Sequence, residues 1–173
     1  LLNLKKLYLK SAAVLNVEAK EALKRADKIV ICPGDLYCSL IPNFLVNGMR
    51  EALAKIKARV ICVGNLTTKP GQTDGYSLVD YVKILEKYLG RGVIDYVIYN
   101  KERPAERFLK KYLRPGENLV AAGDLSRLPK IKFLGYNLLS YKVYEAKPGD
   151  SLGHLRSLIR YDPHKLAKII YNI

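Results

Sequence analysis

The sequence predicts an α/β protein with a Rossmann-like parallel sheet flanked by helices and a less regular carboxy-terminal part. Two observations lead to this prediction: apolar runs of strand length alternate with segments of helical composition, and these runs are apolar throughout rather than at every second residue. Continuous apolar runs are typical of parallel strands that are covered on both faces. A chain of 173 residues also suits one domain, which we expect to span residues 1–173.

The amino-terminal part of the chain contains three predicted strands and two predicted helices. In order, these are a strand over 4–9, a helix over 17–26, a strand over 29–32, a helix over 39–54 and a strand over 60–63. Pro33 and Gly34 end the second strand. The long helix is predicted because apolar residues recur near one of its faces, namely Leu40, Phe44, Leu45 and Met49.

The rest of the chain continues the alternation. We expect a helix over 78–88, a strand over 94–99, a helix over 107–113, a strand over 132–138, an irregular loop over 144–155 and a terminal helix over 163–173. Ser77 and Asp80 form a capping-box pattern at the start of the first of these helices, and Gly90 ends it. Strands and helices in this order predict right-handed βαβ units.

The amino-acid composition limits the kinds of partner that we expect this chain to bind. The net charge of +14 raises the expectation of an anionic partner, but the basic residues are dispersed and are not interleaved with aromatic residues. We therefore expect a solvated, lysine-rich surface rather than a nucleic-acid site. The apolar stretches are too short to span a bilayer, so no membrane partner is expected.

The cysteines and the start of the chain indicate the cellular compartment in which we expect the protein. Cys32, Cys38 and Cys62 have no CxxC spacing, so we expect reduced thiols and no zinc site. The chain begins Leu1-Leu2-Asn3 without a signal-peptide pattern, and we expect it to be a fragment of a cytoplasmic protein.

The loop after the second predicted strand, residues 32–39, is the first candidate ligand site. Gly34 permits a close backbone approach, and Ser39 is expected to cap the next helix, whose amino-terminal N–H groups would face an anion. Asp35 suits a sugar hydroxyl or a base edge better than a phosphate. The candidate contacts here are Gly34, Asp35, Leu36, Tyr37 and Ser39. An ordinary turn with a helix cap explains the same residues equally well.

The loop over residues 65–77 is the second candidate. It is long, it follows a buried strand, and it is rich in hydrogen-bonding side chains, which favours a functional loop over a plain surface loop. Its candidate contacts are Asn65, Thr67, Lys69 and Thr73.

Asn100 ends the next predicted strand and is the third candidate. Its carboxamide either satisfies nearby backbone groups or contacts a base. The ends of parallel strands collect ligands, so all three positions are expected at one edge of the sheet.

Four segments, in order along the chain, resemble YvcK-like proteins of the CofD superfamily. Residues 26–46 resemble AD-x-I-V-x-GPGSLYTSIIPNLLV, residues 65–76 resemble NLMTQPGETxGY, residues 94–100 resemble IDxVIVN, and residues 159–167 resemble IRHDPxKLA. The match covers nearly the whole chain.

The resemblance implies a Rossmann-like fold, binding of UDP-sugars such as UDP-N-acetylglucosamine, and roles in gluconeogenic growth and cell-shape control. No cofactor is implied besides a UDP-sugar or other nucleotide ligand. By position, Tyr112 and Arg160 resemble the family residues that contact the nucleotide-sugar. Tyr112 is otherwise a helix-end core residue, and Arg160 otherwise pairs with Asp162. The alternative function is that of CofD, a 2-phospho-L-lactate transferase acting on a deazaflavin.

Some positions depart from the family pattern. Cys32 stands for Gly, Asp35 for Ser, Cys38 for Thr, Lys69 for Gln, Gln72 for Glu and Tyr161 for His, and a stretch at about 141–155 resembles an insertion. The two changes in the second loop shift its charge by two units toward positive, which favours an anionic ligand.

The family's amino-terminal half carries a GGGTG phosphate loop and acidic motifs on which CofD chemistry depends, and these motifs do not occur in this sequence. An amino-terminal half that supplies the phosphate loop, and a homo-oligomer, are both compatible with the sequence. His154 and His164 have no nucleophile at a persuasive spacing and are expected at the surface. We expect this chain to bind rather than to catalyse.

Overall fold

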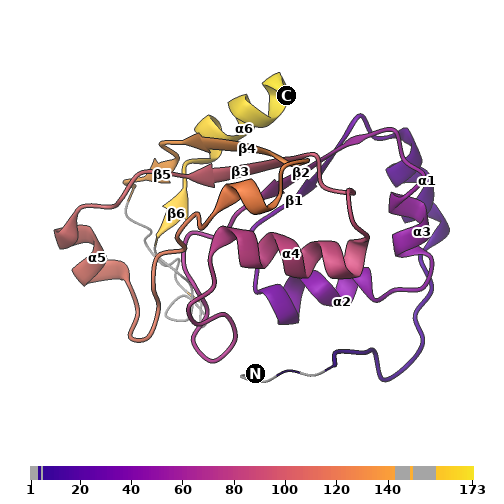
Figure 1. Ribbon diagram of the computed structural model, residues 1–173, viewed down its shortest axis with the longest axis horizontal. Coiled ribbons are helices and arrows are strands. Elements are labelled where there is room, and N and C mark those ends of the chain that lie inside the picture. Colours follow the sequence, from indigo (N-terminus) through magenta and orange to yellow (C-terminus); the bar gives the residue numbers. More distant parts are fainter. Residues whose placement is uncertain (1–3, 5, 143–148, 150–158) are drawn as a thin grey trace.

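The computed structural model describes residues 4, 6–142, 149 and 159–173. Its centre is a four-stranded sheet in the order β1 (Lys28–Ile31), β2 (Arg59–Val63), β3 (Tyr96–Asn100) and β4 (Lys132–Tyr136) (Figure 1). Each strand is parallel to its neighbours, as the alternation of strands and helices predicts. The α/β fold with a parallel sheet is thereby confirmed.

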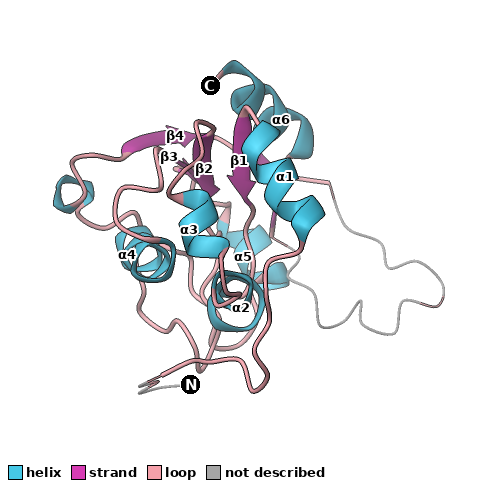
Figure 2. Cartoon of the chain, turned by 90° about the vertical axis from the view of Figure 1, so that its right-hand side faces the viewer, coloured by secondary structure: helices cyan, strands magenta, loops and turns pink. Residues whose placement is uncertain are grey.

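Helices cover both faces of the sheet. α2 (Ile41–Phe44), α3 (Met49–Leu53) and α4 (Leu78–Leu89) lie on one side and α6 (Pro163–Asn172) on the other (Figures 1 and 2). α1 (Val17–Arg25) lies beside α3, and α5 (Glu106–Tyr112) lies beyond the carboxyl end of β3. A two-stranded antiparallel ladder joins β5 (Leu139–Ser140) to β6 (Arg160–Tyr161). None of the helices that the structure describes is long and apolar enough to cross a membrane.

Alternate residues of each central strand pack on opposite faces, and both faces are apolar. Val60, Cys62 and Val97 belong to the larger core cluster, which includes the buried side of α4. Ile61 and Ile98 point the other way and belong to the cluster that apolar side chains of α6 cover. Burial on both sides explains why these strands are continuously apolar.

The ends of α4 are determined locally. Ser77 and Asp80 form the capping box, because Ser77 N donates to the Asp80 carboxylate at 2.9 Å and Asp80 N donates to Ser77 Oγ at 3.3 Å. Gly90 ends the helix with a φ of 110°, a conformation that glycine adopts readily. Both features confirm the prediction for this helix.

The single helix predicted over 39–54 is wrong. The chain instead forms a π-helical turn (Leu36–Leu40), then α2, a break, and α3. Gly48 has a φ of 89°, which no helix residue has. Asn47 pairs with a distant segment, since its N–H donates to the Ala13 carbonyl and its carbonyl accepts from Leu15 N, both at 2.9 Å. The spacing of apolar residues suggested one helix because α2 and α3 both pack against the same core on either side of the break.

The strand predicted over 4–9 is also wrong, since residue 4 and residues 6–9 form no strand. Leu4 and Leu7 pack against the core, whereas Tyr8 is exposed. Alternating burial therefore reflects a chain that lies on the surface of the core without a partner strand. The predicted loop over 144–155 and His154 fall outside the described residues, apart from Gly149.

Candidate functional site

A cavity of about 380 Å³ lies beyond the carboxyl ends of β1 and β2. Gly34 and Asp35 line it from the first predicted loop, Asn65, Thr67 and Lys69 line it from the second, and Arg160 lines it from β6. These are six of the candidate residues that the sequence indicates, and the fold brings them together. The position agrees with the general rule that parallel sheets bind ligands at the carboxyl ends of their strands.

The two loops are joined at the floor of this cavity. Asn65 Nδ2 donates a hydrogen bond of 2.9 Å to the carbonyl of Gly34. Asn65 is partly buried, so this bond fixes the amide where the two strand ends lie side by side. The side chain therefore connects the loops as well as lining the cavity.

The first loop turns inward after Asp35. Leu36 and Tyr37 are buried in the main core, and the Tyr37 hydroxyl lies 3.0 Å from that of Tyr76. Burial raises the pKa of the Tyr37 hydroxyl, which keeps it protonated. Both side chains face away from the cavity and hold the loop in place.

Ser39 does not cap a helix, contrary to the prediction. It lies within the π-helical turn, and its backbone carbonyl accepts a 2.6 Å hydrogen bond from Asn43 Nδ2. Leu40 occupies the position before α2 and provides no side-chain cap. The turn begins at Asp35, whose carbonyl accepts from Ser39 N, so the expected cap is replaced by an early backbone turn.

The second loop is held by a buried threonine. Thr73 Oγ1 accepts hydrogen bonds from Lys69 N at 2.8 Å and from the Tyr81 hydroxyl at 2.7 Å. Thr73 is therefore a structural residue that anchors the loop to α4 and fixes the backbone of Lys69. Thr67 forms an isolated bridge with Leu119, which ties the start of the loop to a later segment.

Lys69 faces Asp35 across the mouth of the cavity. Lys69 Nζ lies 3.5 Å from Asp35 Oδ2, and the two side chains are 43% and 40% exposed. Because both are well solvated, the pair is a weak contact that leaves each charge accessible to a ligand.

Arg160 reaches the cavity from β6, a strand too short to predict. Arg160 is paired with Ser140, and the hydroxyl of the next residue, Tyr161, donates a 2.6 Å hydrogen bond to the carbonyl of Gly64. Asp162 caps α6 by accepting from His164 N and Lys165 N, and these bonds lower its pKa. Two anchored residues thus follow Arg160 directly and fix the backbone beside it.

Asn100 lies at a second cavity, of about 440 Å³, which shares Asn65 and Leu66 with the first. Its carboxamide oxygen accepts from Leu138 N at 2.9 Å, and its nitrogen donates to the Glu102 carbonyl at 2.6 Å. The carboxamide therefore satisfies backbone groups, which is the first of the two roles that the sequence allowed. Tyr112 is the last residue of α5, and its side chain lies outside the described part of the chain.

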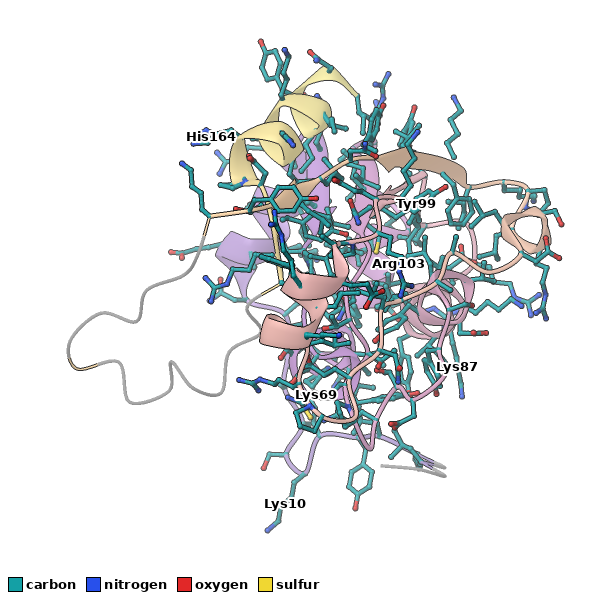
Figure 3. All side chains as sticks on the ribbon, turned by 90° about the vertical axis from the view of Figure 1, so that its left-hand side faces the viewer. Lys10, Lys69, Lys87, Tyr99, Arg103 and His164 are labelled. Atoms are coloured by element: carbon teal, nitrogen blue, oxygen red, sulfur yellow. The ribbon has the colours of Figure 1, made fainter. Side chains whose placement is uncertain are left out.

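Figure 3 views the molecule from this end of the sheet, with Lys69 labelled at the first cavity and Arg103 at the second. Two of the labelled lysines, Lys10 and Lys87, lie in separate parts of this view, which agrees with a dispersed positive charge. Within the described residues, no three His, Cys, Asp or Glu side chains gather as a metal-binding group.

Sequence reasoning missed two charged residues of the first cavity, Arg114 and Glu117. Glu117 is buried and its carboxylate accepts from Arg114 N at 3.2 Å, closing a short turn after α5. The only signal for this turn is the Pro115-Gly116 pair between them. That pair predicts a turn but does not indicate that the turn folds back to the strand ends.

Comparison with known proteins identifies the family. The CofD family, described as 2-phospho-L-lactate transferase CofD, matches residues 2–140. A candidate gluconeogenesis factor of Thermotoga maritima is 48% identical over 158 residues, which are 90% of this chain and 46% of that protein. The gluconeogenesis factor of Bacillus subtilis is 30% identical over 156 residues, which are 90% of this chain and 45% of that protein.

A solved structure agrees with the sequence matches. The crystal structure of protein BH3568 from Bacillus halodurans superimposes with a TM-score of 0.77 at 27% identity, and the match covers 91% of this chain and 47% of that one. The chain therefore spans about half the length of these relatives. The family match, the two relatives and the shared fold agree, and the chain belongs to the CofD family, on its YvcK-like side.

Proposed function

We propose that the first cavity binds the diphosphate and sugar of a nucleotide-sugar, with UDP-N-acetylglucosamine as the first candidate. The observation that carries this proposal is the convergence of Lys69 and Arg160, from separate elements, on one strand-end cavity that amide and hydroxyl groups also line. Guanidinium and ammonium groups suit diphosphate oxygens, and an Arg can donate two parallel hydrogen bonds to them.

The second cavity supports a ligand of this length. It adjoins the first through Asn65 and Leu66, and apolar residues of its lining include Leu78 and Leu139. The sugar and diphosphate would then contact the charged and polar residues of the first cavity, and the base would contact the apolar residues of the second. Ligand sites of this kind combine an apolar lining with a few well-placed polar groups.

We propose that a polypeptide like the unmatched portion of the relatives completes this site. It would do so by pairing with the outer edge of β1. Arg59 N donates to the carbonyl of Asp27, and bonding alternates along a parallel strand, so the backbone groups of Lys28, Val30 and Cys32 point to the outer edge. An open edge of this kind is a template for another strand. The neighbouring helix α1 has no buried residue, which leaves its surface available to the same partner.

A parallel strand at this edge would also place the ligand at a switch point. The described sheet runs β1-β2-β3-β4 in chain order and contains no reversal of direction. If the first strand of the added portion pairs with the outer side of β1 and its later strands lie further out, the strand order reverses beside Gly34, where open α/β sheets bind nucleotides. The phosphate loop that the family resemblance implies belongs on this strand.

This completion is tested by co-expressing the chain with the portion of the Thermotoga maritima relative that it does not match. We expect the two to co-purify, and Val30→Pro to prevent this, because proline removes an edge N–H that no strand in the described part of the chain uses. Ile29→Pro is the control for internal damage, since it removes an N–H that faces β2 and should lower the stability of the chain itself. Co-purification that survives Val30→Pro would contradict the proposed edge.

In the cell, we propose a regulatory role in gluconeogenic growth and cell-shape control, exerted in the cytoplasm through nucleotide-sugar binding. The names of the relatives from Bacillus subtilis and Thermotoga maritima support the gluconeogenic part. A CofD-type transferase is the second candidate because the matching family carries that description. Formation of a phospholactyl-deazaflavin by the co-expressed pair would favour it over regulation.

Calorimetry tests the ligand. We expect UDP-N-acetylglucosamine to bind the chain on its own, because Lys69 and Arg160 both belong to it, and to bind more tightly when the completing polypeptide is present. Arg160→Ala should weaken binding by the chain at least tenfold, a typical loss for a charged hydrogen-bond partner. Arg91→Ala is the matched control, because Arg91 is exposed in the turn between α4 and β3, at the other end of the sheet. Binding that Arg160→Ala leaves unchanged would contradict the proposal.

A further inference from the structure

Two side-chain contacts join the first and second loops, and one of them, between Asp35 and Lys69, lies at the first cavity. Lys69 Nζ lies 3.5 Å from Asp35 Oδ2, and Gln72 Nε2 lies 3.5 Å from Cys38 Sγ. In each contact one residue belongs to the first loop and the other to the second. Side chains therefore join the two loops at two places, and only the Asp35–Lys69 contact borders the cavity.

We propose that Asp35 is a built-in competitor for the anion-binding group of Lys69, so that the Asp35–Lys69 pair determines how strongly the cavity selects phosphate. The inference rests on the proposed function, because it assumes an anionic ligand in this cavity. A phosphate group displaces the Asp35 carboxylate from Lys69, whereas an uncharged ligand leaves the pair intact. Asp35 therefore lowers affinity for anions instead of contacting the sugar.

The geometry allows this exchange at low cost. The separation of 3.5 Å exceeds the roughly 2.7–2.9 Å of a tight charge-assisted hydrogen bond, and both side chains are about two-fifths exposed. Exposed pairs of this kind contribute little stability. The diphosphate of a nucleotide-sugar carries two negative charges, one on each phosphate, and therefore competes effectively with a single solvated carboxylate.

Both backbones are fixed, so only the side chains need to move. Lys69 N donates to Thr73 Oγ1, and the Lys69 carbonyl accepts from Gln72 N and Thr73 N. The Asp35 carbonyl accepts from Ser39 N at 2.8 Å. The lysine can change partner while the loops keep their positions.

The second contact keeps the loops together without charge. Cys38 and Gln72 are a thiol and an amide, and they remain in contact whichever partner Lys69 has. The exchange is thus confined to one ion pair. The positive charge of Lys69 is thus balanced by Asp35 until an anion binds.

Three variants and three probes test the proposal. The variants are Asp35→Asn, Lys69→Gln and the double variant, and the probes are UDP-N-acetylglucosamine, inorganic pyrophosphate and uncharged uridine, measured by calorimetry. We expect Asp35→Asn to tighten binding of UDP-N-acetylglucosamine and of pyrophosphate by about threefold to fivefold, the upper part of the range for an exposed ion pair. Uridine binding stays unchanged. The double variant matches Lys69→Gln, because Asp35 acts only through Lys69.

The outcomes separate this inference from the proposed function. Weaker or unchanged binding of both phosphorylated probes by Asp35→Asn would overturn the competitor role and leave nucleotide-sugar binding intact. A gain with pyrophosphate but no binding of UDP-N-acetylglucosamine would keep the competitor role and overturn the proposed ligand. Absence of binding by any probe to any variant would overturn both. Circular dichroism confirms that each variant is folded.

Discussion

Thr73 holds the second loop against α4, and replacing it by valine tests this role quantitatively. The side chain is fully buried, and its Oγ1 accepts from Lys69 N and from the buried Tyr81 hydroxyl. Valine keeps the volume but leaves both donors without an acceptor. An unpaired buried donor costs about 1–3 kcal/mol, so the loss of both bonds should lower the free energy of unfolding by roughly 2–6 kcal/mol. That is a large share of the about 5–15 kcal/mol by which domains are stable.

Urea denaturation followed by circular dichroism measures this loss, and Thr73→Ser is the matched control. Serine keeps the oxygen and removes only a buried methyl group, at a cost of about 1 kcal/mol. We therefore expect the unfolding midpoint of Thr73→Val to lie clearly below that of Thr73→Ser, with similar slopes. A valine variant at least as stable as the serine variant would refute the assignment of Thr73 as the acceptor that holds the loop.

Three further predictions concern other parts of the structure. Tyr161→Phe removes the 2.6 Å hydrogen bond to Gly64, so the free energy of unfolding in urea should fall by about 1–2 kcal/mol; an unchanged value would contradict this anchor. Hydrogen bonds from Ser77 lower the pKa of Asp80, so its contribution to stability is present above about pH 4 and is lost as the pH falls through its folded pKa. This acid-dependent loss should be smaller in Asp80→Asn, and equal losses would argue against it. Burial raises the pKa of Cys62 to about 12, so a thiol reagent should label only the two exposed cysteines until urea unfolds the chain.

The sheet could be predicted because its signals are local and agree with each other. β2 contains the apolar run 60–63 and β3 the run 96–99, and α4 has both a capping box and a glycine stop. The break at Gly48 could not be predicted, because it depends on pairing between Asn47 and residues more than thirty positions earlier. Local apolar spacing contains no information on such a partner.

In the candidate site, too, some residues could be predicted from local sequence and others could not. Gly34, Asn65 and Lys69 were predicted together because parallel strand ends meet at one edge. Leu36 and Thr73 lie in the same polar loops but turn into the core, and a loop sequence does not indicate which way each side chain points. Arg114 and Glu117 were missed because they approach the cavity through a turn that only the tertiary fold positions.

The central claim is that the strand-end cavity binds a nucleotide-sugar, and a titration of the isotope-labelled chain with UDP-N-acetylglucosamine tests it most directly. In ¹H–¹⁵N spectra, we predict saturable shifts of amide signals in residues 34–39, 65–73 and 160–161, with the helices α1 and α6 unaffected. A parallel titration with uridine should perturb fewer of the residues around Lys69. The absence of saturable shifts, or shifts confined to the surface of α1 or α6, would contradict nucleotide-sugar binding at this cavity.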